Sequence, residues 1–169
     1  MMRNHPLILF FLLLRSEWDG KHNVYYGHAI VCDEKGVNQH ILRAQKDLHG
    51  MKYGLVMVHP STFVTKAAYN RYGIFDKNYK CSMDYELLLR FYRGGARVKY
   101  IDKALAVYRL GGTNMKYRKR TITEVKNISI KYGANPIMAN IIRIRKSVID
   151  KVRPILKILN IRNHKVEKL

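Results

Sequence analysis

Short apolar and β-branched runs predict strands in the first two thirds of the chain. Residues 24–32 are β-branched and aromatic, and the turn-like residues 33–36 end that run. Three further apolar runs have the length of buried strands: 53–58, 98–100 and 105–108. Turn signals bound these runs, with His59-Pro60 after the second and Gly111-Gly112 after the last. We therefore expect a strand at each of these runs.

Helical patterns lie between these runs. Thr65 can cap a helix over residues 66–72, and Gly73 can end it because glycine takes positive φ without strain. A second helix is expected over residues 84–93, which begin with acidic residues and end with arginines, as the helix dipole favours.

Beyond residue 115 the apolar period becomes helical. Thr121 and Glu124 fit a capping box, and Asn135-Pro136 predicts the start of another helix. Pro154 is expected to kink or break that helix. Its apolar residues step by three and four along one face: Ile141, Ile144, Val148, Val152, Ile155 and Leu159.

The apolar run over residues 6–14 is too short to cross a bilayer, which takes about 20 residues. We interpret it as a buried helix or strand. A signal peptide or anchor is the alternative, although no small-residue cleavage site follows the run.

The charge divides the chain. Lys and Arg number 32 against 12 Asp and Glu, a formal net charge of +20. Residues 116–169 carry 15 basic and 3 acidic side chains, a net of +12, whereas residues 1–115 carry a net of +8. We therefore predict a globular body over 1–115 and a basic amphipathic helical extension over 116–169, with phosphate, nucleic acid or an anionic membrane as partner.

Several kinds of active site have no signature in the chain. The two cysteines are too few for a disulfide framework, and the spacing of His22, His28 and Cys32 matches no standard zinc pattern. There is no Asp-x-Asp, no phosphate-binding glycine loop and no nucleophile elbow. The sequence therefore predicts no metal ligand in this chain.

One stretch carries a denser signal. Its segments are His59 to Phe63, Tyr72 to Asp76, Ser82 to Arg90, Tyr100 to Asp102, Leu105 and Tyr108 to Gly112. Their order and spacing resemble the acceptor-side half of family 2 glycosyltransferases, enzymes of bacterial polysaccharide biosynthesis. The resemblance covers roughly residues 23–114. It implies an α/β fold: a partial GT-A-like mixed sheet with flanking helices, to which the basic C-terminal helices are added.

The resemblance also implies roles for individual residues. Asp84 would be the general base that takes the proton of the acceptor hydroxyl in inverting transfer. His59, Asp76, Gly111 and Gly112 would line the cleft for donor or acceptor. From residue type alone, the N-cap of its helix is the favoured role for Asp84. Family members often have Glu-Asp at this point, where this chain has a methionine before Asp84.

The resemblance begins in the middle of the family's domain. The donor would be a nucleotide sugar and the acceptor a saccharide or a lipid-linked sugar. The family's Asp-x-Asp, which holds Mg²⁺ or Mn²⁺ in a complete enzyme, has no counterpart here. We therefore expect a C-terminal fragment or truncated gene product that binds no cofactor and is inactive alone. Its expected location is cytoplasmic, peripheral to the inner face of the membrane.

Three interpretations of the basic extension remain open. An apolar stripe among Lys and Arg residues is typical of a helix lying in an anionic membrane interface. The stripe can instead pack on the body. Single-stranded nucleic acid is the third, weaker interpretation, suggested by residues 116–120. A non-catalytic basic protein that binds membranes or nucleic acid is thus the alternative to a transferase.

Overall fold

The computed structural model describes residues 13–33, 36, 39–109 and 117–158, with side chains of the last helix as far as Val152. The fold is α/β, with a mixed four-stranded sheet and surrounding helices. The α/β class that the sequence predicts is confirmed.

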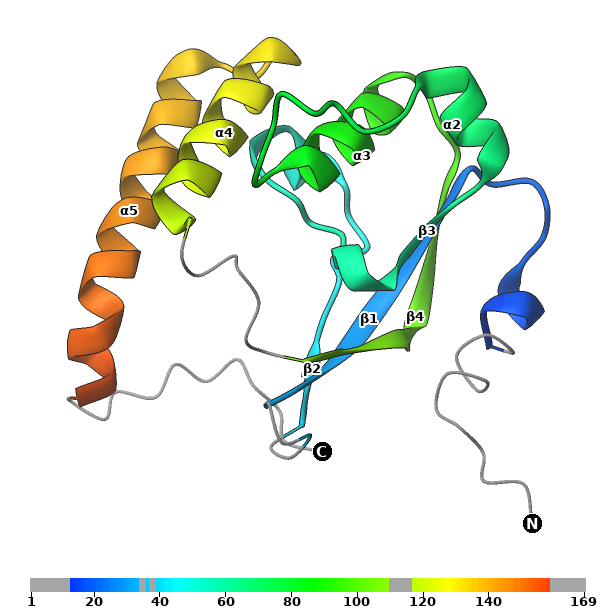
Figure 1. Cartoon of the computed structure of the whole chain (residues 1–169), viewed down its shortest axis with the longest axis horizontal. Helices are drawn as coiled ribbons and strands as arrows, with labels where there is room; N and C mark the ends of the chain where they lie inside the picture. The colour runs from blue at the N-terminus through cyan, green and yellow to red at the C-terminus, as the bar shows by residue number, and fades with distance from the viewer. Residues whose placement is uncertain (1–12, 34–35, 37–38, 110–116, 159–169) are drawn as a thin grey trace.

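The sheet is organised around β1 (Val24–Cys32), which pairs with all three other strands (Figure 1). β2 (His40–Leu42) and β3 (Thr62–Val64) pair antiparallel with opposite ends of β1. β4 (Val98–Arg109) runs parallel to it along almost its whole length. Since β1 supplies most of the pairing, its side chains are almost all buried.

The pairing of β1 with β4 is irregular around Gly27, where the register shifts on both sides of His28. A Cβ atom at Gly27 would lie 2.6 Å from the carbonyl oxygen of Lys103 and 2.7 Å from that of Ile101. Only a glycine therefore allows the two backbones to approach this closely.

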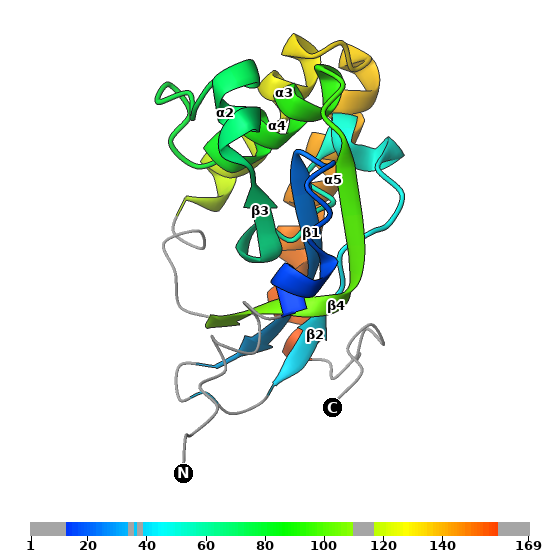
Figure 2. The same ribbon diagram turned by 90° about the vertical axis from the view of Figure 1, so that its right-hand side faces the viewer.

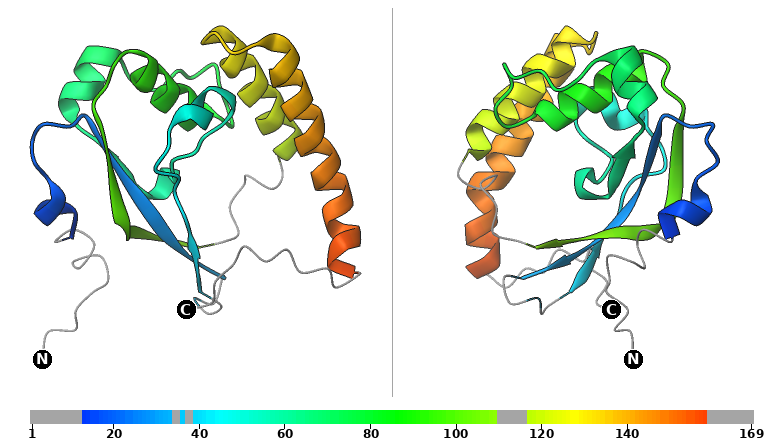
Figure 3. Two further views of the ribbon diagram at one scale, coloured as in Figure 1. Left: turned by 180° about the vertical axis from the view of Figure 1, so that it is seen from behind. Right: turned by 45° about the vertical axis from the view of Figure 1, so that its right-hand side comes forward.

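The helices lie over one end of the sheet and along its side. Figures 1 and 2 show α2 and α3 at that end, and Figure 3 shows α4 and α5 as a hairpin beside them. Their bounds are η1 His49–Tyr53, η2 His59–Ser61, α2 Lys66–Tyr72, α3 Met83–Arg93, α4 Arg118–Lys131 and α5 Pro136–Ile158. No helix in the described ranges combines the length and apolarity needed to cross a membrane.

Three local predictions are confirmed. The Oγ1 of Thr65 accepts a hydrogen bond from the amide of Ala68 (3.1 Å), and Gly73 ends α2 with φ +87°. The Oδ1 of Asn135 accepts from the amides of the second and third residues after it (2.9 and 3.1 Å), so it caps α5.

The predicted strands are partly wrong. Residues 53–58 form no strand: η1 ends at Tyr53 and irregular backbone follows, although Met57 and Val58 are buried as expected. The runs 98–100 and 105–108 belong to one continuous strand, β4.

The basic helices also differ from expectation. The capping box is wrong, because α4 begins at Arg118 and Thr121 lies inside it. α5 continues through Pro154 to Ile158 without a break. Of the run at residues 6–14, positions 6–12 lie outside the described residues, whereas Leu14 packs against a small buried cluster containing Tyr25.

The main core lies between the sheet and the helices. α3 is buried around most of its circumference, and Leu87, Leu88, Leu89 and Phe91 belong to one core cluster with Val24. α4 adds Ile128, which is fully buried in the same cluster. The first helix beyond residue 116 is thus packed into the core of the preceding segment.

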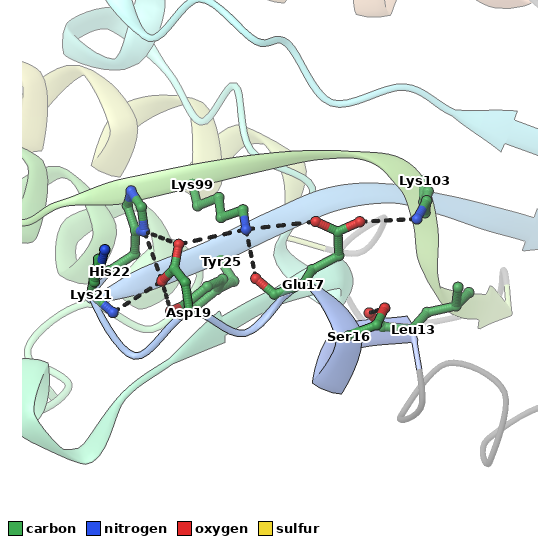
Figure 4. Close-up of polar contacts among 9 residues, drawn as sticks. All are labelled: Leu13, Ser16, Glu17, Asp19, Lys21, His22, Tyr25, Lys99 and Lys103. Atoms are coloured by element: carbon green, nitrogen blue, oxygen red, sulfur yellow. Dashed lines mark hydrogen bonds and ion pairs between the residues drawn. The ribbon is translucent and has the colours of Figure 1, made fainter.

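A polar network ties the segment before β1 to β4 (Figure 4). The carboxylate of Asp19 accepts from the hydroxyl of Tyr25 (2.7 Å) and lies 3.5 Å from the ammonium of Lys99. Glu17 accepts from Lys103 (2.9 Å) and lies 3.6 Å from Lys99. These contacts fix the segment although it contributes no strand.

The close approach at Gly27 gives a stability prediction. Gly27→Ala should lower the free energy of unfolding by about 3 kcal/mol, because the methyl group would overlap two backbone oxygens that cannot move independently. Gly54→Ala is the matched control: its Cβ would meet only the flexible end of Lys146, at 3.1 Å. Urea unfolding of both variants measures the difference, and equal midpoints would contradict the close approach.

Candidate functional site

Two residues predicted from the sequence for the site meet at the start of α3. Asp84 lies in the first turn of α3, and its Oδ1 accepts from the amide of Tyr85 (2.8 Å). Its Oδ2 lies 3.9 Å from Nδ1 of His59, the first residue of η2. The side chains are 30% and 50% exposed, so both reach solvent. Asp84 is not the N-cap, which is Ser82, so that alternative is wrong.

The backbone that leads into α3 is held by a carboxylate from α4. Glu124 accepts hydrogen bonds from three consecutive amides, those of Lys80 (3.2 Å), Cys81 (2.9 Å) and Ser82 (2.9 Å). Successive backbone amides directed at one point form an anion-binding concavity, and here a side chain of the same protein fills it. The position of Asp84 therefore depends on α4.

The same carboxylate is paired with Arg120, whose Nε donates to it at 2.8 Å. Burial alone would raise the pKa of Glu124. The hydrogen bonds from Arg120 and from the three amides outweigh burial and hold the pKa below its ordinary value. Glu124 is thus ionised, and 12% exposed, at neutral pH.

A second carboxylate anchors the other side of α3. Glu86 is 1% exposed and accepts from Nε (3.2 Å) and Nη2 (3.1 Å) of Arg90, one turn later. Arg90 also donates to the carbonyl oxygens of Tyr72 and Ile74, and the hydroxyl of Tyr132 donates to Glu86. This pair connects the loop after α2, α3 and the end of α4.

Asp76 lies in that loop rather than beside Asp84. Its Oδ1 accepts from the amide of Asn78 (3.0 Å), and its Oδ2 lies 3.9 Å from the ammonium of Lys131. Within the described segments, Asp76 makes no hydrogen bond or ion pair with His59 or Asp84. The two remaining predicted residues, Gly111 and Gly112, lie outside the described residues.

The structure shows a polar cluster that sequence reasoning missed. Nδ1 of His28 accepts from the amide of Ala44 (3.0 Å), so Nε2 carries the proton and donates to Asp102 (2.9 Å). The hydroxyl of Tyr100 donates to the same carboxylate oxygen (2.8 Å). The spacing of Tyr100 and Asp102 was a usable signal, since residues two apart in a strand share a face.

The cluster presents a carboxylate to solvent from a buried support. His28 is 6% exposed, whereas the side chain of Asp102 is 79% exposed. The hydrogen bonds from Tyr100 and then His28 hold the pKa of Asp102 below its usual range. Asp102 is therefore oriented and charged, which suits it to bind a cationic or hydroxyl group.

The described residues do not fit the divalent cation that the resemblance implies for a complete enzyme. Among them, no three His, Cys, Asp or Glu side chains come together to ligate an ion. His22 pairs with Asp19, and Cys32 is buried beside Tyr108, so neither joins His28 in a zinc site. None of the roles proposed for these residues involves a metal ion.

A groove of about 250 Å³ opens between α4 and α5. Its lining combines apolar residues with Arg118, Lys146 and Asp150. Neither Asp84 nor His59 lines this groove.

The Glu124 contacts predict an acid-dependent loss of stability. Glu124→Gln replaces one acceptor oxygen by a donor that faces backbone amides, and should cost about 2 kcal/mol at neutral pH. Because the folded pKa is lowered, the wild-type advantage is full above the unfolded value of about 4.3 and is lost as pH falls through the folded value.

Unfolding by urea at several pH values measures this advantage. Lys119→Gln, an exposed substitution in the same helix, should change stability by less than about 0.5 kcal/mol at every pH. A Glu124→Gln variant that stays as stable as wild type at pH 7 would show that the three contacts contribute nothing.

Comparison with known proteins gives no match: no family model, curated protein or solved structure is similar to this chain. The expected resemblance to family 2 glycosyltransferases therefore rests on the motif residues alone.

Proposed function

We propose that this chain supplies the acceptor side of an inverting glycosyltransferase that uses a nucleotide-sugar donor. The acceptor would be a saccharide or lipid-linked sugar of polysaccharide biosynthesis. The finer fold assignment, a partial GT-A domain, belongs to the same proposal. The observation that carries it is the pairing of Asp84 with His59 on a rigidly held helix start.

The two carboxylate oxygens of Asp84 have different surroundings. Oδ1 is held by the amide of Tyr85, whereas Oδ2 faces His59 and solvent. A sugar hydroxyl is a weak nucleophile, so a carboxylate oxygen that takes its proton during attack accelerates transfer. Oδ2 is the oxygen placed to do so.

In the proposed step one bond forms, one bond breaks and one proton is transferred. The acceptor oxygen forms a bond to the anomeric carbon as the bond from that carbon to the diphosphate breaks. The acceptor proton passes to Oδ2 of Asp84, and the nucleoside diphosphate leaves with the electron pair. His59, 3.9 Å from Oδ2, is placed to hold the incoming hydroxyl by a hydrogen bond.

The complete reaction needs a donor-binding half, which would also supply the Mg²⁺ or Mn²⁺ that the resemblance implies. We propose a cytoplasmic location, peripheral to the inner face of the membrane, where lipid-linked acceptors are accessible. The second candidate is a non-catalytic basic protein that binds membranes, and the exposed apolar residues of α5 favour it.

Substitution of Asp84 tests the transferase proposal. With a family 2 donor-binding half supplied, Asp84→Asn should slow sugar transfer by at least about a hundredfold, the usual scale of general-base catalysis. The amide keeps an oxygen that can accept from Tyr85, so the fold should be retained. The measurement is transfer of labelled sugar to acceptor, with donor binding assayed separately.

Asp47→Asn is the matched control, since Asp47 is a largely exposed carboxylate that pairs only with His49 among the contacts the structure describes. The control should transfer at the wild-type rate. Near wild-type transfer by Asp84→Asn would instead make Asp84 a structural residue, whereas no transfer by the unsubstituted protein would favour the non-catalytic candidate.

A further inference from the structure

The side of α5 that faces α4 combines charged residues with apolar ones, Ile142 among them. Arg118 of α4 donates to Asp150 of α5 through its guanidinium group, with 2.9 Å between Nη2 and Oδ1. Lys146 lines the groove between the two helices, and burial, followed by the charge of Arg118, lowers its pKa. Ala139 is buried on the same side. Charged residues thus share this helix contact with Ala139 and Ile142.

The opposite side of α5 carries a continuous apolar row, which we name the α5 stripe. Its members are Ile137, Ile141, Ile144, Val148 and Val152. Steps of three and four place them on one face of the helix, and their exposed fractions range from 37% to 72%. The interpretation that this row packs on the body is wrong for the described part of α5.

Cations border the stripe on both sides. Arg145 follows Ile141 by four residues and Lys151 follows Val148 by three, and both side chains are exposed. Over residues 136–152 the sequence holds one acidic residue, Asp150, and it belongs to the contact with α4. The outward surface thus combines aliphatic side chains with positive charge.

The combination of aliphatic and cationic side chains on this surface favours some binding partners over others. A second copy of the chain would place its own Arg145 and Lys151 near those of the first, and each copy has a formal net charge of +20, so like charges oppose that pairing. Nucleic acid would be attracted by the cations but would leave an aliphatic row in contact with phosphates and water. An anionic bilayer satisfies both components, because its acyl region takes the stripe and its headgroups take the cations.

We infer that α5 docks on anionic lipid bilayers, with the α5 stripe inserted at the interface and Arg145 and Lys151 against the headgroups. The inference identifies the surface that would hold the protein at the proposed membrane location. It stands independently of glycosyl transfer, because it rests on α5 alone, and its test involves no enzymatic assay.

Vesicle binding by the full chain tests the inference. The probes are vesicles of phosphatidylglycerol mixed with phosphatidylcholine, and vesicles of phosphatidylcholine alone, each at low and at high salt. Wild type should bind the anionic vesicles, more weakly but measurably at high salt, where the electrostatic part is screened. Binding to the zwitterionic vesicles should be at least about tenfold weaker.

Paired variants separate the two components. Ile144→Gln with Val148→Gln should weaken binding at least about tenfold at both salt concentrations, since two apolar side chains are lost from the interface. Arg145→Gln with Lys151→Gln should weaken binding by about fivefold per charge at low salt and by much less at high salt.

The matched control is Leu42→Gln with Val107→Gln, which replaces two aliphatic side chains of similar exposure on the sheet. It should bind like wild type. Because all of these positions are exposed, the variants should keep the circular dichroism of the wild type. If the double stripe variant does not fold, Ile141→Gln alone provides the same comparison.

Three results would overturn the inference. The first is equal vesicle binding by the stripe and control variants, and the second is no binding of anionic vesicles by wild type. The third is a lipid-free dimer that the stripe substitutions dissociate, which would assign the stripe to a second copy. If wild type binds a single-stranded oligonucleotide but not anionic vesicles, and the stripe substitutions leave that binding unchanged, the positive charge would be assigned to nucleic acid.

Discussion

The carboxylate of Glu124 is the contact on which the arrangement of the site depends. It binds three consecutive backbone amides that precede α3, and these would otherwise need water or a ligand. Because Glu124 belongs to α4, this contact joins the basic C-terminal helices to the helix that carries Asp84. The hydroxyl of Tyr85, 3.0 Å from that of Ser129, adds a second link between α3 and α4. Asp84 thus occupies a fixed position although it lies at the surface.

Local signals predicted local structure well. Thr65 and Gly73 delimit α2 and Asn135 caps α5, since each acts within one helical turn. Glu124 shows the limit of such reasoning. Its spacing from Thr121 fits a capping box, yet the backbone amides that it binds lie more than 40 residues earlier in the chain, and tertiary contact overrides the local pattern. Similarly, residues 53–58 form an apolar run of which only Met57 and Val58 are buried, and the structure shows no strand there.

Individual residues of the site were predictable from the sequence, but their positions relative to one another were not. The resemblance predicts both Asp84 and His59 for one cleft, but only the fold shows that they lie 3.9 Å apart. His28 and Asp102 are 74 residues apart and meet because β1 and β4 are paired around Gly27. Periodicity likewise identified an apolar row on α5 but gave no indication of its direction. The row faces outward because charged residues, Arg118 and Asp150 among them, make the contact between α4 and α5.

Amide hydrogen exchange at the start of α3 tests most directly whether Glu124 fixes the position of Asp84. At neutral pH the amides of Cys81 and Ser82 should exchange as slowly as those inside α3, because both donate to the ionised carboxylate of Glu124. Their protection should fall as the pH drops through the pKa of Glu124, while the amides inside α3 stay protected. Exchange at neutral pH as fast as that of the exposed residues 46 and 47 would contradict the account, because the helix start would then be free to move.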